Sequence, residues 1–225
     1  AGVAVQQSGG STIVNEADLS GSGQDSFTVR LNTEPAAGTL VFVSIGTADG
    51  QTTVDKTVVV FSPTGGPQPW NSAQTVTVTA VDDAIAESSS HPAAITFSVS
   101  SGDGAYASIS VSPLTAQVLD NDSAGILVSP TIGLFTTEGL QTATFTVVLT
   151  SRPTVSVTIP LSIPDSSEGS LAVSQVVFAP NVWNVPQSVV VTGVNDDQQD
   201  GDIAYTVVTG VVSSGDGRYG GLNPP

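Results

Sequence analysis

The stretch Trp70-Asn71-Ser72-Ala73-Gln74-Thr75-Val76-Thr77-Val78-Thr79 recurs as Trp183-Asn184-Val185-Pro186-Gln187-Ser188-Val189-Val190-Val191-Thr192, at a spacing of 113 residues (183 − 70). A second motif repeats at the same spacing: Ser101-Gly102-Asp103-Gly104 with Tyr106, and Ser214-Gly215-Asp216-Gly217 with Tyr219. A repeat period above 100 residues indicates whole domains in tandem and not a solenoid. We therefore predict two domains, one over residues 1–122 and the other over residues 123–225.

Alternating apolar and polar residues make up much of both repeats. Apolar side chains stand at every second position in four runs, which are Phe27 to Leu31, Val76 to Ala80, Ile95 to Val99 and Val155 to Leu161. This period of two is typical of strands with one buried and one solvated face. Clusters of Gly, Pro, Asn and Asp separate the runs as turns, and no stretch shows a helical period. The sequence thus predicts an all-β fold of two tandem immunoglobulin-like antiparallel β-sandwiches.

The register of the repeat bears on the last strand of the second domain. Pro225 corresponds to position 112 (225 − 113), just before the run Leu114-Thr115-Ala116-Gln117-Val118-Leu119 of the first repeat. We expect the second domain to lack its closing strand, and the chain to be a fragment of a longer protein. An open sheet edge can pair with another chain. We expect a monomer, with a strand-complemented dimer as the alternative.

The charge of the chain limits its partners. There are 20 acidic residues against 4 basic ones, for a formal net charge of −16. Such a charge repels nucleic acid and anionic lipid headgroups, and no apolar run is long enough to span a membrane. We expect neither nucleic-acid binding nor direct membrane insertion. Because the chain has no Cys, disulfides and thiolate metal sites are excluded. Cations are the favoured partners of the carboxylates, and a merely soluble, salt-adapted surface is the alternative.

The acidic residues of the first repeat gather in expected loops and strand ends. They are Glu16, Asp49, Asp82, Asp83, Glu87, Asp120 and Asp122. In a Greek-key sandwich alternate strand ends meet at one pole, so segments far apart in sequence can converge there. Calcium takes six to eight oxygen ligands, which loops can supply, whereas zinc or copper would call for His or Cys. The single His91, between Ser90 and Pro92, is expected to be solvated. The pattern therefore predicts a calcium site at one pole.

This arrangement resembles the Calx-beta domain, a family found in sodium–calcium exchangers, integrin subunits and large bacterial surface proteins. The resemblance spans both repeats, and it is carried by Val14-Asn15-Glu16-Ala17, Ala48-Asp49-Gly50, the run from Gln74 into Asp82-Asp83 with Glu87, and Asp120-Asn121-Asp122. It implies a seven-stranded sandwich in which seven residues coordinate Ca²⁺ at one end: Glu16, Asp49, Asp82, Asp83, Glu87, Asp120 and Asp122.

The resemblance also implies a calcium site in the second repeat. The matching positions are Glu138, Asp165, Asp196, Asp197 and Asp200, with Asp202 nearby. Asn195 stands where the first loop aspartate is expected, and the terminal acidic triplet has no counterpart within the chain. We therefore expect the second repeat to bind calcium more weakly than the first, or not at all.

Four further repeated residues fit structural roles. Asp103 and Asp216 stand in glycine-containing turns, where an aspartate accepts hydrogen bonds from nearby backbone amides. Trp70 and Trp183 precede a strand at the same place in each repeat, which favours a packing role over a glycan platform.

The predicted function is that of a calcium-binding spacer or adhesion module in a large secreted or cell-surface protein. Its partners would be neighbouring repeats of the same parent chain, and calcium at the domain poles would rigidify the array. The alternative is a calcium-independent domain that binds a glycan or a protein. We do not expect an enzyme, because one His and no Cys cannot form a Ser-His or Cys-His set.

Overall fold

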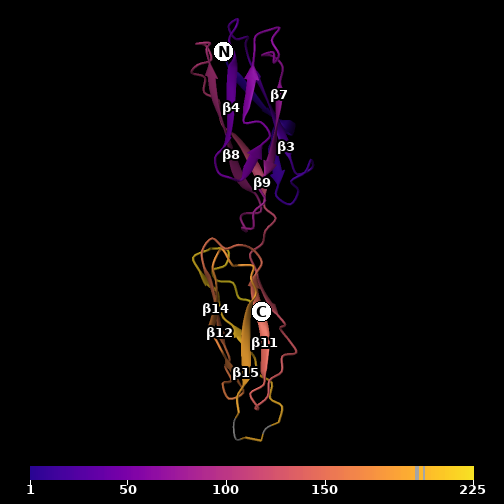
Figure 1. Cartoon of the computed structure of the whole chain (residues 1–225), viewed down its shortest axis with the longest axis vertical. Coiled ribbons are helices and arrows are strands. Elements are labelled where there is room, and N and C mark those ends of the chain that lie inside the picture. Colours follow the sequence, from indigo (N-terminus) through magenta and orange to yellow (C-terminus); the bar gives the residue numbers. More distant parts are fainter. Residues whose placement is uncertain (196–197, 200) are drawn as a thin grey trace. The chain divides into compact units, whose positions relative to one another are not determined.

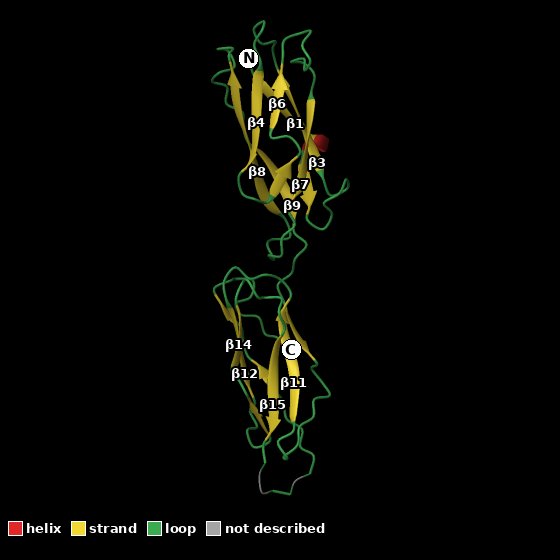
Figure 2. Cartoon of the chain, viewed as in Figure 1, coloured by secondary structure: helices red, strands yellow, loops and turns green. Residues whose placement is uncertain are grey.

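The computed structural model describes residues 1–195, 198–199 and 201–225, and it confirms the predicted all-β class. Apart from one short 3₁₀ helix, η1 (Ser8–Gly10), every regular element in the described residues is a strand (Figure 2). The chain divides into two compact units (Figure 1). Unit 1 comprises residues 1–83 and 87–121, and unit 2 comprises residues 84–86 and 122–225. No helix in the described residues is long and apolar enough to cross a membrane.

Unit 1 is a sandwich of two sheets. The first sheet is antiparallel and has the order β1 (Val3–Gln7), β3 (Asp25–Leu31), β7 (Gln74–Ala80), β5 (Thr52–Val54). The second has the order β2 (Thr12–Asn15), β9 (Leu114–Leu119), β8 (His91–Ser101), β4 (Val41–Thr47), β6 (Val58–Phe61). In this second sheet β2 runs parallel to β9, whereas the other neighbours are antiparallel.

The core of unit 1 lies between its two sheets. Phe27, Val29 and Leu31 of β3 and Val41 and Val43 of β4 are fully buried in one cluster. They are the apolar members of the alternating runs, because successive side chains of a strand point to opposite faces. Each such side chain stabilises the fold by about 1.5–3 kcal/mol relative to an exposed position.

Unit 2 repeats most of this arrangement. Its first sheet, β10 (Ile126–Ser129), β11 (Thr142–Leu149), β15 (Gln187–Gly193) and β13 (Gly169–Leu171), has the strand order of the first sheet of unit 1. The pairing repeats as well: Phe27 lies opposite Val76 in unit 1, and Phe145 lies opposite Val189 in unit 2. The two repeats therefore share both their sequence register and their strand register.

The second sheet of unit 2 is smaller than that of unit 1. It contains β14 (Gln175–Phe178), β12 (Val157–Ser162) and β16 (Val208–Thr209), and β17 (Ser213–Ser214) also pairs with β12. Among the described residues of unit 2, no strand takes the places of β9 and β2. Since β2 of unit 1 pairs only with β9, the corresponding residues of unit 2 have no partner strand and form none. The alternating run predicted Val155 as a buried residue at the start of a strand. That prediction is wrong, since Val155 is exposed and β12 begins at Val157.

The repeated Ser-Gly-Asp-Gly motif forms a corner in each unit. Tyr106 and Tyr219 are buried, and their hydroxyls donate hydrogen bonds to the carbonyls of Thr33 at 2.5 Å and of Ser151 at 2.6 Å. Trp70 and Trp183 are half-buried and pack against the two cores. Their carbonyls accept hydrogen bonds from Leu31 and Leu149, at 3.1 and 3.3 Å, and so extend the pairing of the central strands. Both tryptophans thus have the packing role that their sequence positions favoured.

Candidate metal centre

Three neighbouring strands bring ionisable side chains to one pole of unit 1. Glu16 directly follows β2 and Asp120 directly follows β9, and these two strands are parallel. His91 is the first residue of β8, which is antiparallel to β9. Two parallel strands therefore end where the third begins. The strand order alone places Glu16, Asp120 and His91 at the same end of the sheet.

The loop between β7 and β8 adds Glu87 to this pole. The backbone N–H of Glu87 donates to Oδ2 of Asp120 at 2.7 Å, which holds the loop against the end of β9. The side chain of Gln51 donates to Oε1 of Glu87 at 3.1 Å. One carboxylate oxygen of Glu87 is therefore fixed by an amide, and its Oε2 lies 3.2 Å from Nε2 of His91.

Two overlapping groups of potential ligands result. One ligand atom each from Glu16, Glu87 and His91 lie within 4.8 Å of one another, and the same holds for Glu16, Asp120 and Asp122. Asp122 follows Asp120 by two positions along the chain. Glu16 is common to both groups.

Glu16 is a buried carboxylate. It is only 2% exposed, and neither of its carboxylate oxygens has a hydrogen-bond partner among the described residues. Burial, and then the nearby charges of Asp120, Asp83 and Glu87, raise the pKa of Glu16 from its usual 4.5 to about 7, against a lowering contribution from His91. A carboxylate without a partner is costly in such a place, and a bound cation would offset that cost.

His91 differs from its prediction. Its side chain is only 14% exposed, and both ring nitrogens are buried without a hydrogen-bond partner among the described residues. The expectation that it is solvated is therefore wrong. The alternation of β8 carries the missed signal: Ala93 and Ile95 are buried, and His91 has the same parity along the strand.

The other residues predicted for the site of unit 1 lie in different surroundings. The carboxylate of Asp49 accepts hydrogen bonds from the backbone N–H groups of Gln51 at 3.2 Å and Ala94 at 2.7 Å, as a turn aspartate does. Asp82 and Asp83 are exposed, and Oδ1 of Asp82 accepts a hydrogen bond from the side chain of Asn121 at 3.1 Å. None of these three belongs to either group of potential ligands among the described residues.

Unit 2 shows no equivalent centre in its described part. Glu138, Asp165 and Asp202 are exposed, and Asp165 accepts a hydrogen bond from Ser167 at 2.6 Å. No group of potential metal ligands forms among residues 123–195, 198–199 and 201–225. The predictions for Asp196, Asp197 and Asp200 lie outside the described residues.

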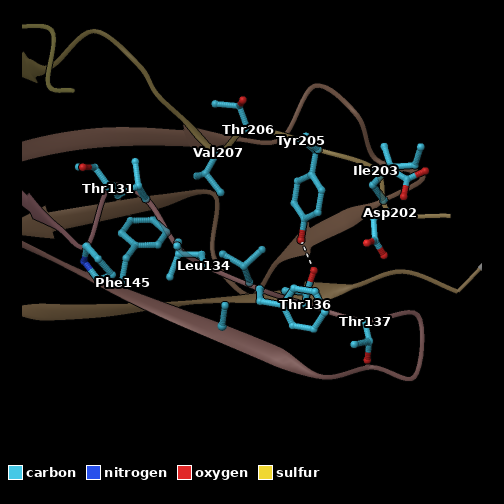
Figure 3. A pocket seen from close by; sticks show the side chains of 18 of the residues that line it. Thr131, Leu134, Thr136, Thr137, Phe145, Asp202, Ile203, Tyr205, Thr206 and Val207 are labelled. Atoms are coloured by element: carbon cyan, nitrogen blue, oxygen red, sulfur yellow. Dashed lines mark hydrogen bonds between the residues drawn. The ribbon is translucent and has the colours of Figure 1, made fainter.

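Unit 2 instead has an open cavity of about 670 Å³ where β2 and β9 lie in unit 1. Leu134, Phe145 and Val207 line it, and Figure 3 shows that they face the same hollow as Tyr205. The hydroxyls of Tyr205 and Thr136 are 2.6 Å apart and share a hydrogen bond (Figure 3). The cavity follows from the smaller second sheet of unit 2, whose apolar interior is left partly uncovered.

Comparisons with known proteins give distant similarities only. No protein-family model matches the chain, and no curated protein does. The solved structure of CBD12 from CALX1.2 is 16% identical, with 95% of this chain and 82% of that chain covered and a TM-score of 0.38. The D0-D1 domain of Intimin is 16% identical, with 92% and 96% covered and a TM-score of 0.31. The YadV chaperone is 9% identical, with 96% of both chains covered and a TM-score of 0.36. Similarities of this size do not assign a function to the chain.

Proposed function

We propose that unit 1 binds a calcium ion at the pole formed by Glu16, Glu87 and Asp120. The observation that carries the proposal is the Glu16 carboxylate, which is 2% exposed and has no hydrogen-bond partner for either oxygen among the described residues. Buried charges in proteins are normally paired or bound to a metal ion. A divalent cation would supply the missing partner.

The ligand types favour a hard cation. Glu16, Glu87 and Asp120 supply carboxylate oxygens, and Asp122 supplies another within the second group of potential ligands. Calcium accepts such oxygens in a flexible shell of six to eight, in which water and backbone carbonyls complete the coordination. Asp82 and Asp83 lie on the same loop as Glu87 and would add negative charge near the ion.

At the level of the whole protein, we propose a spacer or adhesion module of a large secreted or cell-surface protein. The strong acidic balance and the tandem repeat support this proposal. Asp120 closes the first repeat and stands next to the connection to the second, so an ion bound there would restrain the connecting residues. A stiffer connection would hold neighbouring repeats in an extended array.

Thermal unfolding with calcium and with EDTA tests the proposal. The Trp183→Phe variant leaves Trp70 as the one tryptophan, which reports on unit 1. Calcium at 100 times its dissociation constant would stabilise the unit by about 2.7 kcal/mol, which raises the melting temperature by several degrees. Glu16→Gln should abolish that rise, whereas Glu34→Gln, at an exposed glutamate outside the pole, should retain it. An unchanged melting temperature in millimolar calcium would overturn the proposal.

The glycan- or protein-binding alternative stays a prediction. A glycan platform needs exposed aromatic side chains, and Trp70 and Trp183 are half-buried against the cores.

A further inference from the structure

One group of potential ligands at the pole of unit 1 contains a nitrogen donor. Glu16, Glu87 and His91 each place a ligand atom within 4.8 Å of the others. His91 is the only histidine of the chain. An imidazole is a poor ligand for calcium, which prefers oxygen, but a good one for zinc and its neighbours in the first transition series. This group therefore differs in chemistry from the carboxylate group that contains Asp120.

The contact between His91 and Glu87 has the spacing of two ligands on one ion. Nε2 of His91 lies 3.2 Å from Oε2 of Glu87, yet it makes no hydrogen bond with good geometry. Two donors that are each about 2.1 Å from a shared ion are roughly 3.0–3.4 Å apart, for ligand angles between octahedral and tetrahedral. An ion between them would accept a lone pair from Nε2 of His91 and another from Oε2 of Glu87, and Nε2 has no hydrogen-bond partner among the described residues.

Burial supplies a second, independent observation. Glu16 is 2% exposed, and its two oxygens are unpartnered among the described residues, as are both ring nitrogens of His91. Buried polar atoms normally have partners, so two unpartnered side chains that converge call for a common one. The hydrogen bond from Gln51 already holds the other oxygen of Glu87, which leaves Oε2 to face His91.

We propose that Glu16, Glu87 and His91 bind Zn²⁺, with His91 as the nitrogen ligand and Glu16 and Glu87 as oxygen ligands. The inference deepens the proposed function, on which it rests for the location of the site, because Zn²⁺ would share Glu16 and Glu87 with calcium. The two ions would then compete for one pole. Zinc that reaches the site would displace calcium, and His91 would set the preference between them.

The test uses the full chain with Zn²⁺ and Ca²⁺ in separate titrations by calorimetry. We expect Zn²⁺ to bind the wild-type chain and to shift its single imidazole signal in NMR spectra. His91→Gln should weaken Zn²⁺ binding at least tenfold and change calcium affinity less than twofold. Glu34→Gln should leave both affinities unchanged. Circular dichroism checks that each variant is folded, and His91→Asn serves as a second variant.

The outcomes separate the two proposals. Zinc binding that is unchanged in both His91 variants, or an imidazole signal that does not move, would overturn the zinc inference and leave the calcium proposal standing. Zinc binding that needs His91, in a chain that shows no calcium heat, would support the zinc inference while overturning the calcium proposal. If Ca²⁺ suppresses Zn²⁺ binding in the wild-type chain, the two ions share the site as inferred.

Discussion

Glu16 couples the stability of the metal-free protein to pH. Its pKa is raised by burial, and then by the charges of Asp120, Asp83 and Glu87, to about 7, against 4.5 in an unfolded chain. Between these two values the folded state holds a proton that the unfolded state releases. The stability that this proton contributes is therefore fully present below pH 4.5 and is lost as the pH rises towards 7.

We predict that the free energy of unfolding of unit 1, in EDTA, falls by roughly 3 kcal/mol between pH 4.5 and pH 7.5 because of Glu16. Urea unfolding of the Trp183→Phe variant, followed by the fluorescence of Trp70, measures this change. Glu16→Gln should remove the greater part of the slope. A slope that is equal with and without Glu16 would show that other carboxylates cause it.

At the scale of single residues, sequence reasoning located some potential ligands and missed others. Glu16, Glu87 and Asp120 stand in loops and strand ends, where the acidic pattern is visible. Asp49 stands in such a turn too, but its carboxylate accepts two backbone N–H groups, a use that no spacing reveals. His91 was missed because its neighbours Ser90 and Pro92 suggested a loop, whereas β8 begins at His91 itself.

At the scale of elements, the aspartates of the repeated Ser-Gly-Asp-Gly turns, Asp103 and Asp216, hold backbone N–H groups of neighbouring segments. Asp216 is buried, and it accepts hydrogen bonds from the backbone N–H groups of Thr154 at 2.7 Å and Arg218 at 2.9 Å. Although burial raises the pKa of Asp216, these bonds and the charge of Arg218 lower it below its usual value. Its contribution to stability is therefore present at neutral pH and is lost as the pH falls through the lowered pKa.

We predict that Asp216→Ala destabilises unit 2 by about 2–3 kcal/mol, because two N–H groups lose a charged acceptor. Chemical unfolding of the Trp70→Phe variant, which keeps Trp183 in unit 2, provides the readout. Asp202→Ala, at an exposed aspartate of the same unit, should change stability by less than about 0.5 kcal/mol. Equal effects of the two substitutions would contradict a structural role for the corner.

The open cavity of unit 2 reflects the absence of a β9-like strand from its described residues. In unit 1, Leu114, Ala116 and Val118 of β9 point into the core, and β9 also pairs with β2. The residues of unit 2 that correspond to β2 include Leu134 and Phe135, which are 38% and 64% exposed. A strand-complemented dimer remains a prediction from this uncovered edge.

We predict that a chain extended after Pro225 by a copy of residues 113–119 has a more stable unit 2. The added strand would cover apolar side chains and pair with the edge at β16, as β9 does with β8. The melting temperature of the Trp70→Phe background should rise by several degrees. The matched control carries Asp in place of the copied Ala116 and Val118. An equal melting temperature for both extensions would contradict this account of the cavity.

At the scale of elements, the fold was more predictable than the site. The alternating runs predicted the core strands β3 and β7 because one buried face imposes a period of two. The parallel pairing of β2 with β9 was not predicted, since no local pattern records which strand lies beside which. That pairing places Glu16 beside Asp120, so the structure was required to show which of the predicted residues meet at the pole.

Across the whole molecule, which has a net charge of −16, we expect a bound calcium ion to have two effects. An ion at the pole of unit 1 would neutralise part of the local charge, and it would bind the end of the first repeat close to the connection. The proposed array would thus be stiff in calcium and freer in a chelator. Unit 1 holds the groups of potential ligands, and the described residues of unit 2 form none, so we expect the strong site of the chain in unit 1.

Calorimetric titration of the full chain with Ca²⁺, beside its Glu16→Gln variant, tests the central claim most directly. The account predicts that about one ion binds the wild-type chain in a site that Glu16→Gln weakens at least tenfold, with Glu34→Gln as the unchanged control. Equal calcium binding by the wild-type chain and the Glu16→Gln variant, or no binding by either, would contradict it.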